Sequence, residues 1–286
     1  MLAGTIGERN VWRYSALRQA ADYIAGQFTA CGLEPARQSY EVARLPVDNI
    51  EATLPGTSRA REIIVLGAHY DTITGCPGAN DDATGVAALL ELARRPAQRR
   101  HLRTIRFVAF VNEEPPFFRT RDMGSVVYAN AARARGDRIA GMIALDTMGY
   151  YSTAQDSQRY PVAVGPFYPD VGNFIAFVSN LASARLLMKA RRAFRHRTSF
   201  PLQTAALPGS VGGVGWSDHW SFWQAGYPAM MVTDTAPFRY PWYHAAEDTP
   251  DRICDEQLAA VVDGLEYVAT VLAGGVATER PVRAHP

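Results

Sequence analysis

Histidine and carboxylate side chains that could bind a divalent metal gather in one stretch of this sequence. His69 and Asp71 follow the apolar run at 63–66, and Asp81 and Asp82 lie in the glycine-flanked loop that comes next. An imidazole with nearby carboxylates is a ligand set suited to a zinc-like ion. This stretch therefore predicts half of a metal site, with the other half expected downstream.

The downstream half is expected where the central strands end. Apolar runs predict strands at 63–68, 104–111, 139–145 and 228–234. The polar residues that follow them are His69, Glu113 with Glu114, Asp146 and, further along, His244. Because ligands bind at the carboxyl ends of strands in an open α/β sheet, these side chains should converge. Two imidazoles and several carboxylates fit one zinc ion or a pair.

The surrounding elements predict a layered α/β fold. Helical spacing of apolar residues predicts helices at 10–31, 84–95, 123–135, 170–181, 184–196, 217–225 and 255–272. Two further strands are expected at 38–44 and 49–54, joined through Pro46, and a long loop at 198–215. The alternation of strands and helices indicates βαβ units with helices on both sheet faces, and residues 1–286 are expected to form one domain.

Composition excludes several classes of function. A net charge of +1 gives no electrostatic reason to expect nucleic acid, and no apolar run approaches a membrane span. No signal-peptide pattern is seen at the start of the sequence, which fits either a cytoplasmic protein or a trimmed exported one. The three cysteines are widely spaced, which argues against a thiolate zinc site. The stretches at 98–101 and 277–286 are expected to be a solvated connection and a frayed tail.

Five motifs in order resemble the co-catalytic zinc aminopeptidases, whose superfamily also contains glutamate carboxypeptidases, glutaminyl cyclases and the transferrin receptor ectodomain. The resemblance covers roughly residues 63 to 253. The motifs are His69-x-Asp71, Gly78-x-Asn80-Asp81-Asp82-x-Thr84-Gly85, Asn112-Glu113-Glu114, Leu145-Asp146 and Tyr243-His244-x-x-x-Asp248-Thr249. This resemblance implies a three-layer α/β/α fold with a mixed, mostly parallel sheet.

The resemblance also implies a role for each matching position. Asp81 would bridge two zinc ions, one completed by His69 and Asp146 and the other by Glu114 and His244. Asp71 would accept the N–H of His69 and fix its tautomer. The family pattern further implies a cis peptide bond between Asp81 and Asp82.

The implied activity is that of a zinc-dependent exopeptidase, with an aminopeptidase as the favoured kind, acting on a peptide or an amino-acid conjugate. Glu113 would be the general base for a metal-bridging hydroxide, and Tyr243 is a candidate donor to the oxyanion. Two alternatives stay open: a glutaminyl cyclase-like enzyme with a single zinc, and a non-catalytic binding domain on the same fold. Asp218, in a Ser-Asp-His stretch similar to one near the family's site, is expected to position or cap, with metal binding as the alternative.

One segment departs from the family pattern. After Glu113-Glu114 the family has a small residue and a glycine turn, whereas residues 115–122 read Pro-Pro-Phe-Phe-Arg-Thr-Arg-Asp here. This segment could reshape the substrate pocket, so it leaves specificity open. The arginines that could bind a substrate carboxylate are Arg119, Arg121, Arg159 and Arg239. The aromatic residues Trp216, Trp220, Phe222 and Trp223 are expected to belong to the core.

Overall fold

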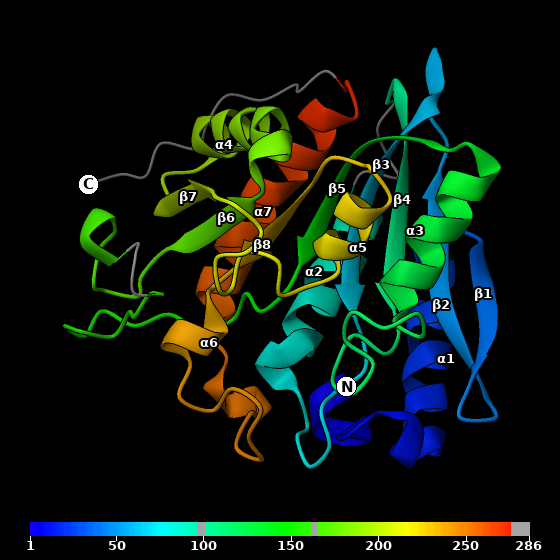
Figure 1. Cartoon of the computed structure of the whole chain (residues 1–286), viewed down its shortest axis with the longest axis horizontal. Helices are drawn as coiled ribbons and strands as arrows, with labels where there is room; N and C mark the ends of the chain where they lie inside the picture. The colour runs from blue at the N-terminus through cyan, green and yellow to red at the C-terminus, as the bar shows by residue number, and fades with distance from the viewer. Residues whose placement is uncertain (96–100, 162–164, 276–286) are drawn as a thin grey trace.

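The computed structural model describes residues 1–95, 101–161 and 165–275. An eight-stranded sheet runs through the molecule in the order β1-β2-β4-β3-β5-β8-β6-β7 (Figure 1). The strands are β1 Pro35–Val42, β2 Leu45–Leu54, β3 Arg59–His69, β4 Arg103–Phe110, β5 Arg138–Leu145, β6 Ile175–Ser179, β7 Leu202–Ala206 and β8 Ala229–Thr233.

The sheet is mixed and mostly parallel, which confirms the expected fold class. The four adjacent strands β4, β3, β5 and β8 all run in the same direction. The antiparallel pairs are β1 with β2, β2 with β4 and β6 with β8. The carboxyl ends of the four parallel strands therefore lie at one edge, where an α/β sheet places its ligands.

Helices cover both faces of this sheet, giving three layers (Figure 1). One face packs against α1, α2, α4 and α7, and the other packs against α3 and α5. The helices are α1 Tyr14–Ala30, α2 Thr84–Arg94, α3 Gly124–Arg135, α4 Ala184–Arg197, α5 His219–Gln224, α6 Ala236–Arg239 and α7 Asp255–Leu272.

Strand β3 shows why the central runs are apolar throughout. Ile64 and Leu66 point into the core beneath α1, α2, α4 and α7, whereas Ile63 and Val65 point into the core beneath α3 and α5. Successive side chains of a strand face opposite sides, so a strand covered on both sides needs an apolar residue at every position. The same arrangement fixes the point at which polar residues can begin, which is the end of the strand at His69.

Two short strands lie where the sequence predicts a helix and a loop. The helix expected at 170–181 is wrong, because Ile175–Ser179 forms β6. The loop expected at 198–215 contains β7, Leu202–Ala206. A five-residue apolar run fits one face of a helix or a strand equally well, and pairing with β8 and β7 decides the matter here.

The hairpin between β1 and β2 turns earlier than the sequence predicts. Its turn is Ala43-Arg44, with φ of 51° and 65°, whereas Pro46 lies inside β2 opposite Glu41. A two-residue hairpin turn can take positive φ at both central positions, so the turn forms without Gly or Pro.

Some expectations fall partly or wholly beyond the described residues. The connection at 98–100 and the tail at 277–286 lie outside them. His101, which was expected to be solvated, is buried. Within the described ranges, no helix combines the length and the apolar character needed to cross a membrane.

Candidate metal centre

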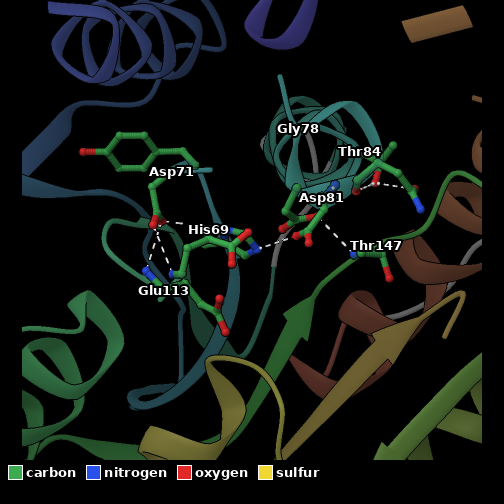
Figure 2. Close-up of polar contacts among 12 residues, drawn as sticks. His69, Asp71, Gly78, Asp81, Thr84, Glu113 and Thr147 are labelled. Carbon is green, nitrogen blue, oxygen red and sulfur yellow. Dashed lines mark hydrogen bonds and ion pairs between the residues drawn. The ribbon is translucent and has the colours of Figure 1, made fainter. Parts of the chain in front are cut away.

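The side chains expected to bind metal meet at the carboxyl edge of the parallel strands. His69 is the last residue of β3, Glu113 and Glu114 follow β4, and Asp146 follows β5 directly. Asp81 lies in the loop before α2, and His244 lies in the loop after α6. Figure 2 shows His69 and Asp81 pointing toward each other from β3 and from this loop.

Asp81 joins the two imidazoles through its two oxygen atoms. Its Oδ1 lies 3.0 Å from His69 Nε2, and its Oδ2 lies 3.1 Å from His244 Nε2. The same His244 nitrogen lies 3.2 Å from Glu114 Oε2. Two groups result, His69-Asp81-Asp146 and Asp81-Glu114-His244, and within each group the potential ligand atoms lie within 4.8 Å of one another. A carboxylate shared in this way has the form of a bridge between two cations.

The charges at this edge fit a bound cation. Burial, with repulsion from Asp81, raises the pKa of Glu114 to about 7 and that of Asp146 to about 6. Burial would also raise the pKa of Asp81, but hydrogen bonds from His244 and His69 outweigh it and lower that pKa. Glu114 Oε1 is buried without a hydrogen-bond partner. Divalent cations would satisfy these oxygens and offset their repulsion, so the residues present fit zinc.

Glu113 lies beside both groups but belongs to neither. Burial raises its pKa well above the usual value, while the charge of His69 acts in the opposite direction. A carboxyl group with a raised pKa beside a metal site is suited to taking up and releasing a proton during a reaction.

Asp71 orients the segment that carries Glu113 and Glu114. Its two oxygens accept the backbone N–H groups of Glu113 and Glu114, at 3.0 and 3.1 Å (Figure 2). Its Oδ1 lies 3.6 Å from His69 Nδ1, which is longer than these hydrogen bonds. Asp71 therefore ties the end of β3 to the residues that follow β4, in addition to facing the imidazole.

Asp82 and Asp248 fix the loop on either side of Asp81. Asp82 Oδ1 accepts the N–H groups of Gly85 and Thr147, which connects the start of α2 to the end of β5. Asp248 accepts the N–H groups of Asn80 and Asp81, one on each oxygen. The peptide bond between Asp81 and Asp82 is cis, as the resemblance implied. The position of Asp81 is thus set by hydrogen bonds from three parts of the chain.

A buried arginine, which the sequence patterns did not indicate, binds carbonyl groups at both ends of the segment that leads from β3 to Asp81. Arg9 is 0% exposed, and its guanidinium donates to the carbonyl oxygens of Tyr70, Pro77 and Gly78 at 2.7, 2.6 and 2.9 Å. Burial lowers its pKa to about 10, so it stays charged at neutral pH. Arg9 lies outside the motifs and about sixty residues before its partners, so no local pattern could have revealed it.

The Ser-Asp-His stretch contributes differently from the metal ligands. Asp218 is buried, and burial raises its pKa to about 7, but it belongs to neither metal group. His219 lies with Nε2 2.8 Å from the carbonyl oxygen of Val214. Within this stretch, His219 binds the loop that contains Val214.

A cavity of about 840 Å³, counting space open to solvent, opens beside the metal groups. Asp146 and Tyr243 line it, and Tyr243 stacks on His244 with ring centroids 3.8 Å apart. Most other lining residues are aromatic or aliphatic, including Tyr160, Tyr168, Phe174, Val214, Trp216 and Phe238. Trp216 was expected in the core, but it is 47% exposed and lines this cavity, whereas Phe222 is fully buried as expected.

Solved structures share this fold and support its class. A zinc aminopeptidase from Bacillus subtilis superposes with a TM-score of 0.77 at 15% identity, covering 96% of this chain and 93% of that one. An aminopeptidase from Aneurinibacillus sp. strain AM-1 gives a TM-score of 0.62 at 28% identity, covering 84% of this chain and 52% of that one. A glutaminyl cyclase from Fimbriiglobus ruber gives 0.64 at 20% identity, covering 92% and 89%. The chain therefore has the fold of the zinc aminopeptidases.

The sequence comparison gives the family. The model of peptidase family M28 matches residues 49–269, and the chain belongs to this family. It is 37% identical to the uncharacterized protein YfbL of Escherichia coli strain K12, over 92% of this chain and 83% of that protein. It is 27% identical to a probable zinc metalloprotease of Leptosphaeria maculans, over 80% of this chain and 59% of that protein. The chain is accordingly a member of a zinc metallopeptidase family.

Proposed function

We propose that this protein is a zinc-dependent exopeptidase with two zinc ions, acting as an aminopeptidase. The observation that carries the proposal is the pair of ligand groups that share Asp81, with the buried Glu113 beside them and outside both. His69 and Asp146 complete one ion, and Glu114 and His244 complete the other. When bound, such a pair supplies an acidified water and a polarised substrate carbonyl.

The protein's own residues then have distinct tasks in this proposal. Glu113 takes a proton from the attacking water and delivers it to the leaving amine, a role that suits its raised pKa. Asp71 holds Glu113 in place through its backbone N–H. Tyr243, which is half-buried and lines the cavity, donates a hydrogen bond from its hydroxyl to the oxyanion that develops on the substrate carbonyl.

The surroundings of the cavity favour an amino-terminal substrate over a carboxy-terminal one. Binding a terminal carboxylate requires Arg or Lys, and the described residues that line the cavity include neither. Arg239 donates instead to Gln158 and to the carbonyl oxygen of Phe174, and Arg121 is 94% exposed.

Metal content and hydrolysis together test the proposal. We expect two zinc ions per chain and metal-dependent cleavage of aminoacyl amides. In Glu113→Gln, kcat should fall by about 10²–10⁴-fold while both zinc ions are retained. The matched control is Glu247→Gln, which changes an exposed carboxylate close to His244 and should behave as wild type.

Three outcomes would contradict parts of the proposal. One zinc per chain together with cyclisation of N-terminal glutamine would favour the glutaminyl cyclase-like alternative. Retained activity in Glu113→Gln would remove Glu113 from the role of general base. No metal uptake and no amide hydrolysis would favour the non-catalytic binding domain.

A further inference from the structure

One wall of the cavity is formed by the loop that precedes α5. Residues 211–214 and Trp216 line the cavity, and Trp216 stacks on Phe238 of α6 with ring centroids 6.2 Å apart. Gly213 has a φ of 84°, and a Cβ there would lie 2.8 Å from the Phe238 ring. The loop thus packs tightly against Phe238, and small shifts in its backbone change the space that the cavity offers.

Two side chains from outside the loop hold consecutive carbonyl groups of this wall. His219 of α5 has Nε2 2.8 Å from Val214 O, and Arg119 donates from Nη2 to Gly215 O at 2.8 Å. Burial lowers the pKa of His219 to about 4, so the ring is neutral and donates from Nε2. These bonds hold the backbone of the two residues directly before Trp216, whose ring lines the cavity.

Arg119 is itself held rigidly. Its guanidinium lies over the rings of Phe118 and Trp220, 5.1 and 5.0 Å from their centroids. A Cβ added at Gly215 would lie 3.1 Å from Arg119 Nη2, so the guanidinium fits closely against this glycine. A planar guanidinium can stack and donate at the same time, which a lysine ammonium cannot do. Arg119 belongs to the segment 115–122, which departs from the family pattern and begins directly after Glu114.

We propose that Arg119 is a positioning residue that sets the cavity wall and thereby the preference for a large apolar side chain next to the scissile bond. This inference rests on the proposed function, because it assigns the cavity to the substrate residue whose carbonyl group reacts. Arg119 acts through Gly215 and Trp216. It connects the segment after the Glu-Glu pair to the selection of the substrate.

The test compares Arg119→Ala with Arg121→Ala, an exposed arginine two residues away in the same segment. The kcat/KM values are measured for phenylalanyl and alanyl p-nitroanilides, together with zinc content and Tm. In Arg119→Ala we expect kcat/KM for the phenylalanyl substrate to fall by about tenfold, mainly through KM, and that for the alanyl substrate by less than about threefold. Zinc content should stay unchanged, and Arg121→Ala should match wild type.

Two further variants keep the inference testable if Arg119→Ala folds poorly. Arg119→Lys retains the charge, but it should lose the same selectivity because it cannot stack and donate together. Gly215→Ala, which crowds Arg119 Nη2, should shift the ratio of the two kcat/KM values in the same direction by a smaller factor. An unchanged ratio in folded Arg119→Lys and Gly215→Ala would overturn the inference, as would an equal loss for both substrates.

A binding measurement separates failure of this inference from failure of the proposed function. Phenylalaninamide is titrated into zinc-loaded protein by calorimetry, which needs no hydrolysis. Binding that weakens in Arg119→Ala, with no hydrolysis by wild type, would support the role of Arg119 in positioning the cavity wall and would overturn the peptidase proposal. Hydrolysis by wild type, with binding and selectivity unaltered in Arg119→Ala, would overturn only the inference about Arg119. Absence of both binding and hydrolysis in wild type would overturn both.

Discussion

The metal edge and the cavity wall lie next to each other but are built in different ways. At the metal edge, His69 ends β3 and Asp146 follows β5, while Asp71 and Asp248 accept the backbone N–H groups of Glu114 and Asp81. The wall at 211–216 is a loop positioned by two donors, His219 and Arg119. In the proposed enzyme, strand ends and buried carboxylates hold the metal groups, whereas a surface loop, which can change independently, would set the choice of substrate.

Removing zinc should have the largest effect on the metal edge. A ligand present at 1,000 times its dissociation constant stabilises a fold by about 4 kcal/mol, so chelation should lower the free energy of unfolding by several kcal/mol. Calorimetry or urea denaturation with and without a chelator measures this loss. If chelation leaves stability unchanged, the buried carboxylates do not require a cation.

The loss on chelation should grow as pH rises. In the metal-free protein the pKa of Glu114 is raised to about 7 and that of Asp146 to about 6, so the folded state binds protons that the unfolded state releases. Stability from these groups is present below about pH 4 and is lost as pH rises through 6 and 7. The raised pKa of His244, about 10, acts in the same direction above about pH 6.5. A chelated protein that becomes more stable between pH 5 and pH 8 would contradict this electrostatic picture.

Arg9→Met should destabilise the segment that leads to Asp81. Its loss leaves the carbonyl groups of Tyr70, Pro77 and Gly78 without their donor, which should lower the free energy of unfolding by about 2–4 kcal/mol. The control Arg13→Met changes a side chain that is 68% exposed and should cost less than about 0.5 kcal/mol. Urea denaturation of the two variants measures the difference, and equal losses would show that the buried guanidinium has no special part.

Trp216→Ala should change only the cavity. We expect a loss of about five- to tenfold in kcat/KM for a phenylalanyl substrate relative to an alanyl one, with zinc content unchanged. Leu181→Ala, at a residue that is 62% exposed and does not line the cavity, is the control. A parallel loss of zinc in Trp216→Ala would show that the wall and the metal edge are not separate, and so would break the comparison.

The sequence predicted which side chains meet at this edge of the sheet because the end of each central strand has its own local pattern. A strand buried on both faces reads as a continuous apolar run, and the first polar residues after it, such as His69 and Asp146, mark the sheet edge. Arg9, β6 and the cavity wall were missed for separate reasons. Arg9 acts across a long separation in sequence, β6 is too short for its period to be read, and the wall depends on which loops meet. The number of domains, expected to be one, stays a prediction.

The hydrogen bonds that Asp248 accepts from the Asp81 loop have a consequence for the order in which the site is assembled. His69, Asp81 and Asp146 are synthesised about a hundred residues before His244 and Asp248. At about 5–20 residues per second, that delay lasts about 5–20 seconds. The residues of the first metal group are therefore all present on the growing chain while the second group still lacks its imidazole. Because Asp248 accepts the backbone N–H groups of Asn80 and Asp81, the shared carboxylate is held in its final place only after His244, the last ligand candidate, has also been synthesised.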